Sequence, residues 1–268
     1  MRRPPLHKAL AAALVLALAL PLAGCSMSFE SASAKALAAL AGVESVHAEL
    51  ELSLGASAGI LGESADWDVS LGLVMDTDGS RTSGSLYLAG GPGARYIVED
   101  RGGEYDLYIS ADGGEDWLSF TGLDAGERAD MDAAPEVDLG GLLALYLEAA
   151  SGFSGKIEDT APTGESCRRY DGFFPGERLV EALELSGSGA YAGLPEGTDF
   201  PDVPMSVWFY RDGGLPARVE LDVTEAMGAY FDGAFEGLAG VTVGIERLVM
   251  SVSLSGYNTA VPATPPAA

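Results

Sequence analysis

The sequence predicts an α+β fold, a strongly curved antiparallel β half-barrel with helices packed on its concave face. Apolar and polar residues alternate with a period of two in several segments, which is typical of strands with one wet and one apolar face. The alternation slips by one residue in the last long strand, which predicts a β-bulge and therefore a curved sheet. One helical segment is apolar on almost every side and needs an apolar surface around it.

The N-terminal segment, residues 1–24, has the pattern of a lipoprotein signal peptide. Three basic residues precede the apolar run Ala9–Leu20, which is too short to span a bilayer as a permanent helix. The Leu-Ala-Gly-Cys that follows resembles the bacterial lipobox and implies that Cys25 becomes the first, diacylglycerol-bearing residue of the mature chain. We therefore expect a protein lipid-anchored to the cell membrane and facing the extracytoplasmic side; the alternative is an ordinary signal peptide with a chance Cys.

The chain is strongly acidic. Its 268 residues include 15 Lys and Arg against 40 Asp and Glu, a net charge of -25. Removing residues 1–24 takes away three basic residues and no acid, which leaves 12 against 40 and a net charge of -28. This charge argues against nucleic acid as a partner and repels the folded body from anionic headgroups, so we expect membrane contact through the lipidated Cys25. With only two Cys and two His, the sequence excludes a disulfide framework and a Cys/His zinc site.

After the anchor, the first expected element is an Ala-rich helix at Ser33–Ala41. Two long alternating segments follow it, and each has one apolar face. The apolar residues are Val46, Ala48, Leu50, Leu52 and Leu54 in the first segment, and Trp67, Val69, Leu71, Leu73 and Met75 in the second. These segments are predicted to be neighbouring strands of the sheet.

Shorter alternating segments at Tyr105–Ile109, Val207–Phe209 and Ala217–Val223 add further strands. The last strand is expected at Val241–Tyr257. Its apolar residues change from odd to even numbers near Glu246, and one extra residue at that point would produce the shift. We therefore expect the bulge there.

Three more helices are expected, at Leu139–Ala150, Pro175–Leu185 and Glu225–Leu238. The first of them is the segment that is apolar almost all round, so we expect it to be buried. No internal repeat or linker divides the chain. The expected parts are a signal peptide at 1–24, a lipidated tether at 25–32, one half-barrel domain at 33–257 and a disordered Pro-rich tail at 258–268.

Asp-Gly dipeptides mark expected turns, because they tolerate positive φ. They occur at 78–79, 112–113, 171–172, 212–213 and 232–233. Asp76–Ser80 looks like the start of a calcium loop, but position twelve, where such a loop has a bidentate Glu, is Tyr87. A hairpin turn is therefore the better interpretation of this segment.

The sequence contains no pattern that predicts catalysis. It has no nucleophile elbow, no Ser-x-x-Lys and no Gly-rich phosphate loop after a strand, so we expect no enzyme activity, no catalytic residue and no cofactor. The acidic segment 124–138 is either a solvated loop or a calcium site, and we expect no metal there. Cys167 is either a small half-buried side chain or a thiol made reactive by Arg168 and Arg169.

The apolar interior is the best candidate for a binding site. The helices at 139–150 and 225–238 are either ordinary core elements or the lining of a cavity for a lipid or another apolar ligand. On the second interpretation, the predicted ligand-binding residues are Trp67, Leu71, Leu73, Leu143, Tyr146, Phe231 and Phe235. The competing hypothesis is an interaction protein with a filled core and exposed aromatic residues, Tyr108, Trp208 and Tyr210, that dock a protein partner.

The order of several motifs is similar to that of a known group of lipoproteins. After the lipobox come the strand Ser45–Leu54, the Asp-Gly-Gly-x-x-Trp segment Asp112–Trp117, and the strand pair Val207–Val223 with its Asp-Gly-Gly-Leu-Pro turn. This order resembles the LolA/LppX-like bacterial lipoprotein superfamily, especially LolA-like surface lipoproteins of Gram-positive bacteria. The resemblance covers most of residues 33–257.

The resemblance implies a half-barrel with helices in its mouth. Some relatives carry lipoproteins or glycolipids in an apolar cavity, and others, such as the GerS-type germination lipoproteins, act through a protein partner. None of the ten Arg residues of the mature chain matches the cargo-contacting Arg of LolA. The expected function is therefore that of an anchored extracytoplasmic lipoprotein that binds or carries a lipid in its half-barrel, with docking of a protein partner as the alternative.

Overall fold

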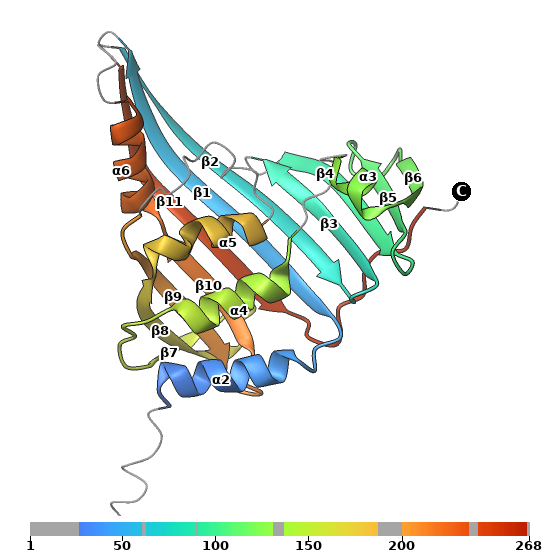
Figure 1. Ribbon diagram of the computed structural model, residues 1–268, viewed down its shortest axis with the longest axis horizontal. Coiled ribbons are helices and arrows are strands. Elements are labelled where there is room, and N and C mark those ends of the chain that lie inside the picture. Colours follow the sequence, from blue (N-terminus) through green and yellow to red (C-terminus); the bar gives the residue numbers. More distant parts are fainter. Residues whose placement is uncertain are drawn as a thin grey trace, which may run out of the picture.

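The computed structural model describes residues 27–60, 63–88, 91–130, 137–186, 200–235 and 241–266. Within these ranges the strands form one antiparallel sheet in the order β6-β5-β4-β3-β2-β1-β11-β10-β9-β8-β7. Their bounds are β1 Val46–Ile60, β2 Glu63–Thr77, β3 Arg81–Leu88, β4 Gly91–Asp100, β5 Tyr105–Ser110, β6 Leu118–Leu123, β7 Ile157–Thr160, β8 Ser166–Phe174, β9 Val203–Tyr210, β10 Pro216–Asp222 and β11 Val241–Ser255. The sheet is curved and open (Figure 1). β1 and β11, the first and last strands along the chain, are neighbours in the middle of the sheet.

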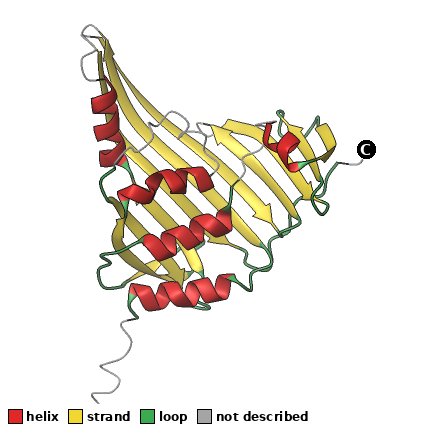
Figure 2. Ribbon diagram, in the orientation of Figure 1, coloured by secondary structure: helices red, strands yellow, loops and turns green. Residues whose placement is uncertain are grey.

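Helices lie across one face of this sheet (Figure 2). They are α2 Phe29–Leu40, α3 Ala125–Asp130, α4 Leu139–Ala149, α5 Leu179–Leu185 with a 3-10 turn at Gly176–Arg178 before it, and α6 Thr224–Phe235. Side chains cap the N-termini of two of these helices. Ser28 Oγ accepts the Ser31 amide at α2, and Asp138 Oδ1 accepts the Gly141 amide at α4. The buried side chains of α2, α4 and α5 form one core with those of the strands.

The predicted bulge is confirmed. Across the β1–β11 pair, Gly55 lies opposite Arg247 and Ala56 lies opposite Ile245, so Glu246 is the extra residue. The phase of the apolar face changes at this point, which keeps both halves of β11 directed at the same side of the sheet. The strand predictions in the two long alternating segments are confirmed as β1 and β2, which pair along their whole length.

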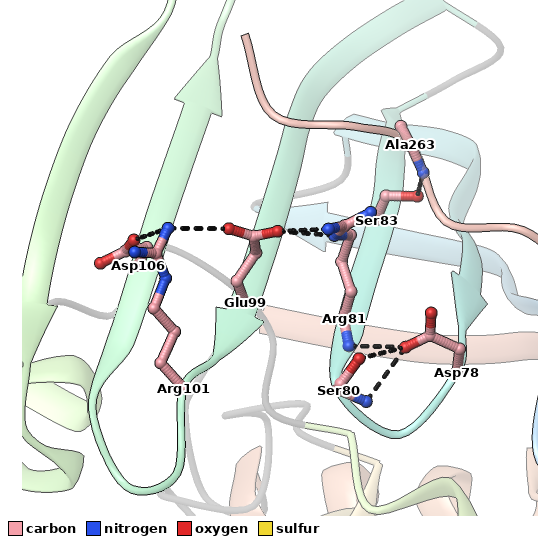
Figure 3. A network of polar contacts seen from close by, with 8 residues as sticks. All are labelled: Asp78, Ser80, Arg81, Ser83, Glu99, Arg101, Asp106 and Ala263. Carbon is pink, nitrogen blue, oxygen red and sulfur yellow. Dashed lines mark hydrogen bonds and ion pairs between the residues drawn. The ribbon is translucent and has the colours of Figure 1, made fainter. Parts of the chain in front are cut away.

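The ends of the domain differ from the expectation. Phe29 begins α2 and is buried, stacked on Phe153 with ring centroids 3.5 Å apart, so part of the expected tether 25–32 is folded. The expected disordered tail 258–268 is also in contact with the sheet. Pro262 is buried, and the Ala263 amide donates to Ser83 Oγ at 2.8 Å (Figure 3). In both places the burial of an apolar ring stabilises the contact of the segment with the rest of the fold. The small and polar residues around each ring do not predict this contact.

Three of the five expected Asp-Gly turns are present, with positive φ at Gly79, Gly113 and Gly213. The other two Asp-Gly dipeptides form no hairpin turn: Gly172 lies within β8, and residues 232–233 lie within α6, where the sequence predicts a helix. A Cβ at Gly172 would lie 2.7 Å from the Ser151 carbonyl oxygen, so this glycine permits a close approach of the backbone instead of a turn.

A ladder of ion pairs ties β3, β4 and β5 together (Figure 3). Arg81 Nε donates to Glu99 Oε1 at 2.8 Å, and Arg101 pairs with both Glu99 and the buried Asp106. At the β2–β3 hairpin, Asp78 Oδ1 accepts the amides of Ser80 and Arg81. This carboxylate therefore caps the turn, as expected for a hairpin and unlike a calcium ligand.

Candidate functional site

A cavity of about 560 Å³ lies between the sheet and the helices. The strands β1, β2, β3, β4, β10 and β11 contribute one wall, and α4, α5 and α6 contribute the other. Its apolar lining includes Leu50, Leu52, Leu71, Leu73, Leu86, Leu88, Leu142, Tyr146, Leu179, Leu183, Val219, Leu221, Met227, Leu248, Met250 and Val252. Polar side chains in the lining come from Glu51, Tyr87, Tyr146, Ser186 and Ser251. A mostly apolar wall of this composition can hold an apolar ligand.

The strand wall is built from leucines in register. Leu71 of β2 lies opposite both Leu52 of β1 and Leu88 of β3, and Leu73 lies between Leu50 and Leu86 in the same way. Because side chains alternate between the two faces of a strand, every second residue of each segment points to this wall. The alternating pattern of the sequence therefore produces a continuous leucine surface across three strands.

The cavity has a buried floor and an exposed mouth. Leu73 and Tyr146 are 7% and 1% exposed, whereas Leu71 and Leu88 at the mouth are 44% and 61% exposed. Two large apolar side chains that face each other in solvent, and continue into an apolar cavity, are typical of a surface that receives a ligand. The mouth is therefore the point of entry that the geometry supports.

Tyr146 provides the polar atom on the helix side of the floor. Its ring packs edge-on against Phe174, with centroids 5.5 Å apart. Burial raises the pKa of its phenol far above the ordinary value, because the charged form would lose its hydration. Tyr146 therefore stays neutral at any physiological pH and adds no charge to the cavity.

The structure places the seven predicted ligand-binding residues differently. Leu71, Leu73 and Tyr146 line the cavity together. Leu143 is buried in the core and does not line it, and Trp67 is 50% exposed on β2 away from it.

The last two predicted residues belong to α6. Phe231 packs against Tyr230, with ring centroids 5.6 Å apart, and is not part of the lining, while the side chain of Phe235 lies outside the described residues. Sequence reasoning missed the contribution of α5, where Leu179 and Leu183 stand four residues apart on one helical face. That spacing was the available signal.

Acidic residues near α3 and α4 act as helix caps. Asp124 Oδ1 accepts the Glu127 amide at 2.8 Å and Glu127 Oε2 accepts the Asp124 amide at 3.1 Å, which is a reciprocal capping arrangement. Asp138 caps α4, and residues 131–136 of the acidic segment lie outside the described residues. In the part of the chain that the structure describes, no three His, Cys, Asp or Glu side chains gather in a way that could hold a metal ion.

Cys167 and Trp208 form a small cluster on the other face of the sheet, together with two alanines. Burial raises the pKa of the Cys167 thiol to about 11, so the neighbouring arginines do not activate it. Trp208 is also buried, between Arg169 and Arg218, whose guanidinium carbons lie 5.6 and 5.7 Å from its ring centroid. Of the aromatic residues expected to form an exposed docking surface, Trp208 is therefore covered.

The anchor predictions fall outside the described residues. The signal peptide and Cys25 precede Met27, where the description begins. Among the helices that are described, none combines the length and the apolar character needed to cross a bilayer.

No family model and no curated protein matches the chain. Among solved structures, a DUF1329 family protein from Desulfovibrio piger is similar over 86% of this chain and 93% of its own, with 11% identity and a TM-score of 0.22. An outer membrane lipoprotein-sorting protein domain from Vibrio parahaemolyticus is similar over 83% of this chain and 91% of its own, with 10% identity and a TM-score of 0.22. A likeness of this degree assigns no function.

Proposed function

We propose that the protein is a membrane-anchored extracytoplasmic lipoprotein that binds a lipid or another apolar ligand between the concave face of its sheet and helices α4 and α5. The observation that supports this is the apolar cavity of about 560 Å³ with exposed leucines at its mouth. Ligand pockets have volumes of roughly 300–1,000 Å³ and are mostly apolar, with a small number of polar groups.

An acyl chain is the ligand that best fits this lining. It would enter past Leu71 and Leu88 and reach the floor at Leu73 and Tyr146, while its polar end stayed in solvent at the mouth. Burial of each methylene contributes about 0.8 kcal/mol, so about ten buried methylenes are enough to offset several kcal/mol of lost freedom on binding. The contribution of methylene burial to the free energy of binding does not depend on the identity of the headgroup.

The proposal is tested by the binding of a fluorescent fatty acid to a chain of residues 26–268, which retains every described element. Leu71→Trp and Leu88→Trp replace exposed leucines at the mouth, so they should weaken binding by about tenfold or more through lost volume, with little change in stability. Leu118→Trp is the matched control, because Leu118 is an equally exposed strand leucine on β6 that does not line the cavity. It should bind like the unmodified chain.

A second control separates the cavity from the core. Leu143→Trp overfills a packed position and should destabilise the fold by about 1–3 kcal/mol while the folded fraction still binds. If Leu118→Trp weakened binding as much as Leu88→Trp, or if the unmodified chain took up no fatty acid, the cavity would not be the binding site.

A further inference from the structure

Two cations lie together at the place where the chain enters the fold. Lys35 of α2 and Arg168 of β8 line a shallow depression with Met27, the first described residue. Neither forms an ion pair with any residue that the structure describes. Most of the other described cations do have carboxylate partners: Arg81, Arg101, Lys156, Arg169, Arg178, Arg211 and Arg218.

The depression is held in place by its neighbours. Tyr170 Oη donates to the Met27 carbonyl oxygen at 2.9 Å, which fixes the entry of the chain against β8. Lys35 lies across Gly214, where φ is +75° and a Cβ would stand 3.1 Å from the Lys35 ammonium nitrogen. A side chain at that position would compete with Lys35 for the space, so glycine keeps the ammonium group at the rim.

The Arg168 side chain has a nitrogen that lacks a hydrogen-bond acceptor. Its Nε is buried and donates no hydrogen bond. The same is true of Nε in Arg169 and Arg218, but their guanidinium groups are paired with Asp171 and Glu220. Arg168 alone of these three forms no ion pair, because Glu158, which lies opposite it in the β7–β8 pair, is paired with Lys156 and Arg211 instead. A guanidinium fork is well matched to a phosphate or a carboxylate.

The sequence places this pair next to the expected anchor. Cys25 stands two residues before Met27, and two residues of extended chain span about 7 Å at most. If Cys25 carries a diacylglycerol, the depression lies within reach of lipid headgroups. The chain after residue 24 has a net charge of -28. Lys35 and Arg168 are two positive charges at the end of the domain that the anchor would bring to the bilayer.

We propose that Lys35 and Arg168 bind the phosphate of an acidic phospholipid beside the lipid anchor. The proposal rests on the anchoring at Cys25 proposed above. Binding at this point turns the α2 end of the domain toward the bilayer. The acidic remainder is repelled from the surface, so the two effects together set the orientation of the domain.

The test follows the side-chain NMR signal of Arg168 Nε in the chain of residues 26–268. The probes are dihexanoylphosphatidylglycerol below its micelle concentration, dihexanoylphosphatidylcholine, and inorganic phosphate. We expect a saturable shift with phosphatidylglycerol at least tenfold tighter than with the other two probes. Arg168→Gln should abolish phosphatidylglycerol binding, and Lys35→Gln, on an exposed helical position, should weaken it without loss of fold. Arg95→Gln, which also removes a cation without an ion pair in the described structure, should leave it unchanged.

Equal affinity for inorganic phosphate would show a site for free phosphate and overturn the lipid assignment. An unchanged Arg168 signal with every probe would overturn the site itself. Leu71 and Leu88 methyl signals report the cavity in the same titration, so a response there without one at Arg168 would defeat this inference and leave the cavity proposal standing. The intact mass of the full chain recovered from membranes tests the lipid on Cys25 separately.

Discussion

His47, the one histidine after residue 24, lies between two carboxylates. Its Nδ1 lies 2.8 Å from Asp76 Oδ1 and its Nε2 lies 3.3 Å from Glu49 Oε1. The ring lies on the polar face of β1 and is half-buried across the β1–β2 pair. Burial lowers the pKa of the ring and is the largest single influence, yet the hydrogen bonds and charges of Asp76 and Glu49 together raise the pKa above its ordinary value.

We therefore expect the NMR titration of the His47 ring to give a pKa above 6.5 that falls in Asp76→Asn, since this variant removes the closer carboxylate. The stability that the ring contributes is fully present below about pH 6.5 and is lost as the pH rises through the folded-state pKa. His47→Gln should remove that part of the pH dependence of unfolding. Asp66→Asn, an exposed acid elsewhere on β2, is the control and should leave the pKa in place. A pKa that Asp76→Asn did not lower would contradict the assignment.

At the scale of elements, the tail after β11 acts as a strap over the sheet. Asn258 adopts a positive φ of 58° and its side chain accepts the Glu44 amide at 2.7 Å. Four residues later Pro262 is buried, and Ala263 then donates to Ser83 of β3. The strap thus joins β11 in the middle of the sheet to β3, three strands away.

A chain that ends at Ala260 should lose about 1–2 kcal/mol of stability, because it lacks the burial of Pro262 and the hydrogen bond to Ser83. A chain that ends at Thr264 keeps both and serves as the control. The free energy of urea unfolding measures the difference. If both truncated chains unfolded at the same urea concentration, the strap would contribute nothing to the fold.

The sequence predicted elements well where apolar spacing was regular. The phase change near Glu246 located the bulge, and the nearly uniform apolar surface of α4 indicated a buried helix. It did not predict β3, because Arg-Thr-Ser-Gly-Ser at its start has no apolar alternation and its position depends on pairing with β2. Tertiary pairing of this kind overrides local propensity.

The site was predicted in part, for a related reason. Alternation identifies the face of a strand, and Leu71 and Leu73 lie on the side that carries the cavity, while their contact with a ligand stays a prediction. It says nothing about how far along a strand the helices reach. Trp67 therefore lies on β2 beyond the cavity, and Leu143 lies on a face of α4 that packs into the core.

At the scale of the whole molecule, the strands that form one wall of the cavity are much longer than the helices that form the other wall. β1, β2 and β11 each have 15 residues, whereas α4 has 11 and α5 has 7. A strand rises about 3.3 Å per residue, so the long strands extend about 50 Å, and α4 and α5, which lie across them, cover only part of that length (Figure 1). The uncovered part of the leucine surface becomes the mouth, at Leu71 and Leu88.

The most direct test of a lipid-binding function is native mass spectrometry of residues 26–268 purified from cells without detergent. We predict a mass above that of the chain, with the excess released as lipid when the protein is denatured. A mass equal to the chain alone, unchanged after incubation with a membrane extract, would contradict lipid binding and favour a protein partner instead.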